Sequence, residues 1–180
     1  AELIYPANFG DDRVLVGAAH NIFIGKVLQQ NSVQIGETGP KTQFAVQVIQ
    51  NIKGNLSGTI TVDQEGGYSN GVLYVVGDDN HGDTLGRGND SRYLLQPGST
   101  YLLATRYSST YDWYTLNSFP TARKTISQNG ALSDSELRSL AQNDLRVTQL
   151  EVAYPHEVLL PADIAHSNIR NSYVSLSEEQ

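Results

Sequence analysis

Apolar residues in the first two thirds of the chain recur at every second position, in short runs separated by turn residues. In the clearest run, Phe44, Val46 and Val48 alternate with Ala45 and Gln47, which is typical of an extended strand in a sheet. Runs of this kind predict strands at residues 21–30, 42–54, 58–67, 72–76, 99–107 and 112–118.

The period of the pattern changes after residue 130, where apolar residues recur at helical spacing. Ser133 is followed three residues later by Glu136, which is the signature of a capping box at a helix N-terminus. The sequence therefore predicts an amphipathic helix at about residues 133–148. Near the start of the chain, Asp11 can cap a short helix within residues 11–20.

Together these elements predict a mainly β protein. The linkers between strands are too short for the crossovers that parallel strands need, so we expect antiparallel pairing. Five or six short strands followed by one helix favour a small barrel or sandwich against which the helix packs. We expect one domain over residues 1–150, followed by a tail, 151–180, that packs on this domain or leads to a neighbouring one.

Charge and composition narrow the range of partners. The net charge is −7, and the 12 Lys and Arg residues are scattered singly, which argues against a nucleic-acid partner. No apolar run approaches the length of about 18 residues that a membrane span requires. The absence of cysteine removes thiolate metal sites and disulfides.

The start of the chain bears on its location. It begins at Ala1 and contains no Met, which favours a mature segment whose signal peptide has been removed. The ten Tyr residues and the many Asn, Ser and Thr residues are common on exported β domains. We therefore expect a secreted or cell-envelope protein.

Gly67, Ser69 and Gly71 match the G-x-S-x-G pattern of a hydrolase nucleophile elbow. That elbow requires a helix directly after the serine, whereas the β-branched run at 72–76 predicts a strand. A glycine-rich turn between two strands is the favoured interpretation. The alternative is a serine hydrolase that uses Ser69 with His81 and a nearby aspartate.

The polar segment 77–92 is rich in oxygen ligands of the kind that calcium prefers. Its candidate ligands are Asp78, Asp79, Asp83 and Asp90. The order of an EF-hand loop is absent, and a solvated acidic loop is the competing interpretation. Apart from this calcium candidate, we expect no cofactor.

Histidine spacing gives no zinc signature. None of His20, His81, His156 and His166 shows the i, i+4 spacing of a helical zinc-protease motif. A site assembled in space and four unrelated surface or capping histidines both remain open.

Aromatic residues gather around the loop that precedes the last predicted strand. They are Tyr107, Tyr111, Trp113 and Tyr114. If buried, they close one end of the barrel, and if exposed, they form an interaction platform.

Three segments, AHNIFIGKV, QFAVQVIQNIKGN and YLLQPGSTYLLATRY, carry a family pattern in their order and spacing. They resemble the netrin-like domain of the tissue inhibitors of metalloproteinases and its bacterial relatives, over roughly residues 14–107. The matching residues are Ala19, Ile22, Gly25, Val27, Phe44, Val46, Ile52, Lys53, Gly54, Leu95, Gly98, Tyr101, Leu102 and Leu103.

The resemblance implies a five-stranded OB-type barrel with accompanying helices. Animal inhibitors of this family chelate the protease zinc with an N-terminal cysteine that is held by disulfides. This chain has Ala1 at that position and no cysteine, so the zinc-chelating mechanism does not transfer directly. What transfers is the scaffold, and a fold does not determine a function.

The sequence thus predicts a non-enzymatic protein-interaction module, with a protease as the narrower candidate partner. The alternatives are the Ser69 hydrolase and a purely structural spacer domain of a larger secreted protein. The candidate contact residues are Ala1, Gly67, Tyr68, Ser69, Asn70, Tyr111 and Trp113.

Overall fold

The computed structural model describes residues 10–76, 85–118 and 120–159. The helices are α1 (Asp12–Ala18), η1 (Ser91–Tyr93), η2 (Pro120–Ala122), α2 (Asp134–Gln142), α3 (Leu145–Ala153) and η3 (Tyr154–His156). The strands are β1 (Asn21–Gly36), β2 (Gly39–Lys53), β3 (Thr59–Glu65), β4 (Gly67–Ser69), β5 (Val72–Val76), β6 (Leu85–Arg87), β7 (Thr100–Ser108), β8 (Trp113–Leu116) and β9 (Arg123–Ser127).

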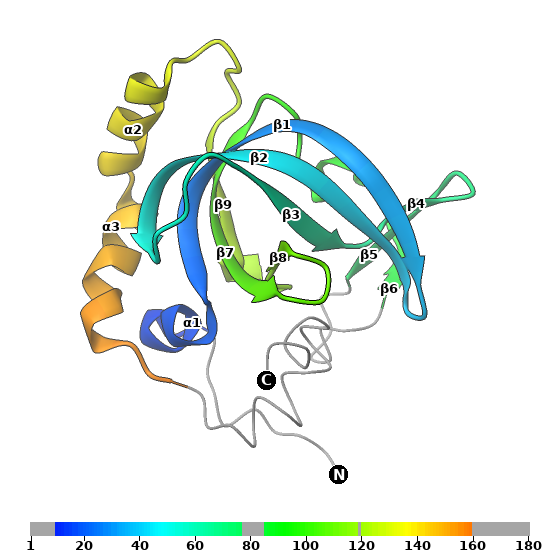
Figure 1. Cartoon of the computed structure of the whole chain (residues 1–180), viewed down its shortest axis with the longest axis horizontal. Coiled ribbons are helices and arrows are strands. Elements are labelled where there is room, and N and C mark those ends of the chain that lie inside the picture. Colours follow the sequence, from blue (N-terminus) through cyan, green and yellow to red (C-terminus); the bar gives the residue numbers. More distant parts are fainter. Residues whose placement is uncertain (1–9, 77–84, 119, 160–180) are drawn as a thin grey trace.

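Five strands form a closed barrel in the order β1-β2-β3-β8-β7, and β1 closes it by pairing with β7 (Figure 1). β9 extends the sheet along β7, on the edge that β8 also uses. The predicted fold class, a mainly β OB-type barrel with a short N-terminal helix and a C-terminal amphipathic helix, is confirmed, although the C-terminal helix is divided in two. One pairing differs from the antiparallel expectation, because β3 and β8 run parallel.

The predicted strand at 72–76 exists, but it does not belong to the barrel. It is β5, the middle strand of a separate three-stranded sheet, β4-β5-β6. The sequence did not predict β4, β6 or β9 as separate strands, because none of these segments has a clear apolar alternation. A strand's partner is set by contacts that are distant in sequence, which a periodic pattern does not contain.

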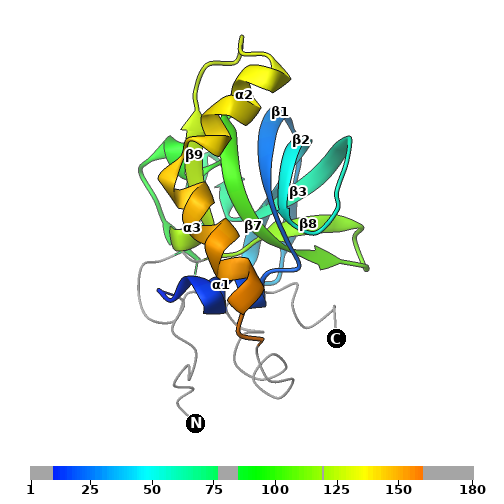
Figure 2. The ribbon, with the colours of Figure 1, turned by 90° about the vertical axis from the view of Figure 1, so that its left-hand side faces the viewer.

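Apolar side chains fill the barrel and also its helix-covered outer side. Because neighbours along a strand point to opposite faces, Phe23, Phe44 and Val62 line the inside, whereas Ile22 and Ile24 point outward. All five side chains are fully buried. Helices α1, α2 and α3 lie together on one side of the barrel (Figure 2). They contribute Leu15, Leu137, Val147 and Leu150 to the same core cluster.

Both predicted helix starts are confirmed. Asp11 caps α1, and Ser133 forms the capping box with Glu136 at the start of α2. The predicted helix at 133–148 is divided into α2 and α3, because Asp144 caps a new helix by accepting from the N–H of Val147 at 3.1 Å.

The segment after residue 150 continues the domain as far as the structure describes it. α3 runs through this position to Ala153. Beyond it, Glu157 pairs with Lys53 at 2.6 Å, and the N–H of Val158 donates to the carbonyl of Arg13. Residues 160–180 lie outside the described part of the chain. Within the described part, no helix has the length and apolar character needed to cross a membrane.

Gly25 provides a test of barrel packing. A Cβ at this position would lie 2.5 Å from Cγ1 of Val46 and 3.0 Å from the ring of Phe23. We expect Gly25→Ala to lower the free energy of unfolding by about 1–3 kcal/mol, measured by urea denaturation, because the core is overpacked. The control is Gly86→Ala in β6, where a Cβ would meet nothing within 4 Å. Equal losses in the two variants would contradict the packing assigned to Gly25.

Candidate functional site

The site is built around the first residues of β2, in a region that we call the loop end. It comprises the β1–β2 turn at residues 36–39, the β4–β5 hairpin at 67–76 and the β7–β8 turn at 109–112. The first residues of β2 connect these parts. Lys41 Nζ lies 5.7 Å from the ring centroid of Tyr111, and Thr42 Oγ1 donates to the carbonyl of Gly66 at 2.8 Å. Two groups of predicted contact residues therefore lie on neighbouring structure.

The aromatic pair at the β7–β8 turn has one buried and one exposed member. Tyr111 stacks on Trp113 with ring centroids 4.4 Å apart and an interplanar angle of 13°. The side chain of Trp113 is 5% exposed, whereas Tyr111 is 45% exposed. Lys41 lies over Tyr111 and also reaches Glu65 at 3.8 Å. Trp113 thus anchors the turn, and Tyr111 is available for contacts.

A row of buried polar side chains supports this face of the barrel. Asp63 Oδ1 accepts from Gln43 Nε2 at 2.7 Å, and Asp63 Oδ2 accepts from Thr115 Oγ1 at 3.3 Å. The row crosses β2, β3 and β8 on the face opposite to Phe44 and Val62. These hydrogen bonds join the three strands to one another on that face.

The β4–β5 hairpin contains the serine that matched the hydrolase pattern. Ser69 pairs with Val72 across a two-residue turn, in which Asn70 and Gly71 both have positive φ. This is the turn geometry that favours tight hairpins. A strand, not a helix, follows Ser69, so the strand–turn–helix elbow is absent here. His81, the proposed partner of Ser69, lies outside the described residues.

Gly67 has no room for a side chain, because it has φ +135° and a Cβ at this position would clash with Thr42 Oγ1. Its neighbour Tyr68 is 46% exposed and lines a groove of about 610 Å³ together with residues of β5 and the segment after β6. Arg87 also lines this groove, and within the described ranges its side chain shows no hydrogen bond or ion pair. The hairpin thus presents a tyrosine, and β6 presents a cation, beside one groove.

Tyr93 in η1 positions the hairpin. Its hydroxyl donates to the carbonyl of Glu65 at 2.5 Å and accepts from the N–H of Val76 at 3.3 Å. Burial raises the pKa of Tyr93 to about 12, so the hydroxyl remains a donor at ordinary pH. No local pattern in the sequence identified Tyr93, Lys41 or Glu65, because their roles depend on contacts between segments that are distant in sequence.

The remaining predicted metal and terminal residues are only partly described. Ala1, Asp78, Asp79 and Asp83 lie outside the described residues. Asp90 caps η1, and the hydrogen bond from the N–H of Arg92 helps hold its pKa below the ordinary value. Among the residues that the structure describes, no three His, Cys, Asp or Glu side chains are grouped closely enough to hold a metal ion.

His20 lies outside the loop end and has a structural role. Its Nδ1 accepts from the N–H of Tyr107 at 3.0 Å. Burial lowers the pKa of His20 to about 4, and the positive charges of Arg106 and Lys53 act in the same direction. His20 is therefore neutral at pH 7.

Comparison with protein-family models gave no match, and comparison with curated proteins gave none either. The function is therefore inferred from the residues themselves. Tyrosine, tryptophan and arginine are the side chains most enriched in protein interfaces. Two exposed tyrosines with neighbouring cations suit contacts with another protein.

Removing the Tyr93 hydroxyl should loosen the hairpin. We expect Tyr93→Phe to lower the free energy of unfolding by about 1–2 kcal/mol and to speed amide hydrogen exchange in residues 67–76. Tyr154→Phe is the control, since no hydrogen bond joins the Tyr154 hydroxyl to another described residue and Tyr154 is 36% exposed. Unchanged exchange in the hairpin of Tyr93→Phe would contradict the positioning role.

The lowered pKa of His20 predicts that the folded protein loses stability in acid. The unfolded chain binds a proton at His20 near pH 6.5, whereas the folded chain binds it only near pH 4, so stability falls as the pH drops between these values. His20→Asn keeps an acceptor for the Tyr107 N–H and cannot titrate. We expect wild type to lose about 1–2 kcal/mol more than this variant between pH 7 and 4, allowing for partial exposure. Parallel stability profiles from urea melts would refute this assignment.

Proposed function

We propose that this chain is a non-enzymatic secreted or cell-envelope module that binds a protein partner through the loop end of its barrel. The observation that carries the proposal is the contact of Lys41 with Tyr111, which places the β7–β8 turn beside the strands that support the Tyr68 hairpin. An aromatic surface on a rigid scaffold is the usual basis of a binding site.

The place of this surface in the fold supports the proposal. OB-type barrels commonly bind ligands on the face of their second and third strands and on the loops after the first and fourth. The equivalent parts here are β2, β3 and the turns at 36–39 and 109–112. Nucleic-acid ligands of such barrels need a basic groove. The net charge of −7 favours a protein ligand instead.

A narrower form of the proposal makes the partner a protease. It rests on the resemblance to the netrin-like domain of the tissue inhibitors of metalloproteinases, including the Ala19 to Val27 and Phe44 to Gly54 segments. Because the chain lacks cysteine, inhibition would rely on the loop end rather than on a disulfide-held terminal cysteine. Export to the cell envelope or medium is part of the same proposal.

The proposal is tested with a double variant, Tyr68→Ser with Tyr111→Ser. The wild-type chain, immobilised and exposed to secreted and envelope proteins of its source, should retain a specific protein. We expect the double variant to bind that protein about 10–100-fold more weakly, because both removed side chains are exposed anchors. The matched control is Tyr154→Ser, which removes a partly exposed tyrosine next to α3.

Two results would count against this function. Retention of no specific protein by the wild-type chain would oppose the module itself, and equal binding by the double variant would oppose the loop end as its site. The narrower form additionally requires that the retained protein be a protease whose peptidase rate falls when the chain is added.

A further inference from the structure

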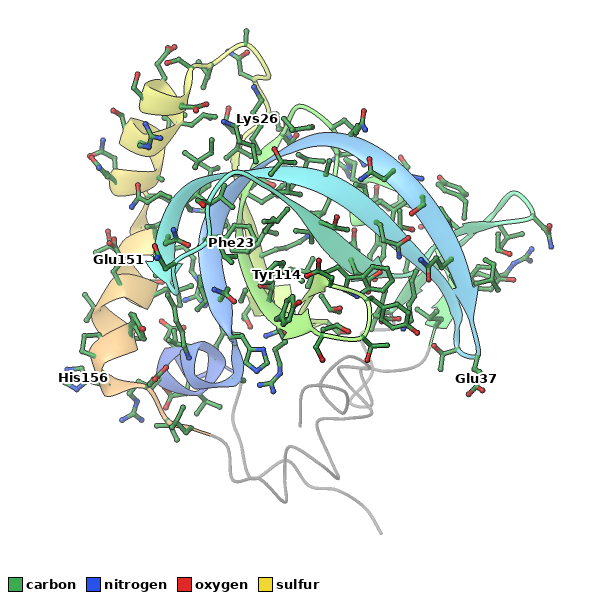
Figure 3. The ribbon with its side chains drawn as sticks, viewed as in Figure 1. Phe23, Lys26, Glu37, Tyr114, Glu151 and His156 are labelled. Atoms are coloured by element: carbon green, nitrogen blue, oxygen red, sulfur yellow. The ribbon has the colours of Figure 1, made fainter. Side chains whose placement is uncertain are left out.

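The second half of β1 leaves the barrel and keeps one edge uncovered. Pairing with β7 ends at Lys26, and the last backbone contacts on that edge join Val27 to Gly98 and Ser99. Within the part of the chain that the structure describes, β1 pairs with β2 alone from Leu28 to Gly36, and every residue of this stretch is exposed. Figure 3 shows Lys26 and Glu37 near the two ends of this stretch. We call residues 28–36 the free edge.

The orientation of the free backbone groups follows from the ladder between β1 and β2. The carbonyl of Pro40 accepts from the N–H of Gly66, so the backbone of Pro40 faces β3 and not β1. Its partner Ile35 therefore belongs to a non-hydrogen-bonded pair, and its N–H and C=O point away from β2. Two residues earlier, Val33 has the same orientation, because the register is regular from Ser32 to Gly36.

The free edge lacks most of the protection that exposed strands usually carry. Edge strands are normally protected by Lys, Pro or bulges. The stretch LQQNSVQIG has no charged residue and no proline, and its register shifts lie before Ser32. Its exposed apolar side chains are Leu28, Val33 and Ile35, at 43%, 37% and 65%. Such an edge is suited to pairing with another strand.

We propose that the free edge pairs with the free edge of a second copy of this chain, in an antiparallel two-fold dimer. The charge distribution supports a second copy as the partner. Each copy carries a net charge of −7, but the free edge itself has no charged residue, so two free edges can pair without placing like charges opposite each other. Gln30, Asn31 and Gln34 both donate and accept hydrogen bonds, and therefore complement an identical strand. A two-fold dimer also pairs the apolar Val33 and Ile35 with their counterparts.

The dimer is weak. A strand pair of this length buries less than the roughly 800 Å² per partner of a standard interface, so the dissociation constant is on the order of 100 µM. The inference uses none of the exposed tyrosines assigned to partner binding. Its success or failure is therefore independent of the function proposed above.

The test is sedimentation velocity on the full chain from about 10 µM to 1 mM, a range that brackets the expected dissociation constant. Wild type should shift from monomer to dimer. Val33→Pro removes an outward N–H without removing a hydrogen bond to β2, and it should remain monomeric. Ile35→Lys leaves the backbone intact and should weaken the dimer at least tenfold, because two ammonium groups approach each other. Val33→Thr keeps the N–H and should still dimerise.

Amide exchange by NMR gives a second measurement on the wild-type chain alone. The Val33 and Ile35 amides should become protected as the concentration rises, whereas the Gln34 amide, which faces β2, should be protected throughout. A wild-type chain that stays monomeric at 1 mM, or a Val33→Pro variant that dimerises equally well, overturns the proposal. Protection of these amides only on addition of a different protein would also overturn it.

Discussion

Closure of the barrel depends on β7, because this strand pairs along both of its edges. One edge pairs with β1 over residues 100–105, and the other pairs with β8 and then with β9. Eight of its nine residues are buried, Tyr107 being half-buried. A sheet that closes in this way leaves no unpaired backbone along the shared stretch. The helices can then cover its outer side, where Ile22, Ile24 and Leu102 project.

Closure also determines where the loops meet. Since β3 and β8 run parallel, the chain must return from the end of β3 before it enters β8, and it does so through the small sheet and β7. The small sheet is held at the end of β3 by the Tyr93 hydroxyl and by Thr42. The turn before β8 then places Tyr111 beside Lys41. The loop end is thus a consequence of the topology rather than of any local motif.

These relations explain how far the sequence could predict the structure. Alternation identified the five barrel strands, and the caps at Asp11 and Ser133 were visible because capping is local. The apolar pattern of residues 72–76 is compatible with a barrel strand and with a strand of a separate sheet. The pattern alone therefore did not identify the strands with which this segment pairs. Tyr111 and Trp113 were identified as candidates because aromatic residues gather around the loop between the last two predicted strands. Lys41 was not, because its contact with Tyr111 joins residues 70 positions apart.

The free edge of β1 follows from the same closure. β1 contains 16 residues, but its pairing with β7 involves only Asn21 to Lys26. Beyond this point β1 has no further pairing with β7, because the segment before β7 turns away at Gly98 and Ser99. β2 continues to pair with β1 as far as Gly39. A hairpin that extends beyond the closed part of the barrel has an exposed strand edge. Such an edge is normally covered, carries charged residues or pairs with another strand. Because this one is uncharged and free of proline on its outer strand, its backbone remains available for pairing.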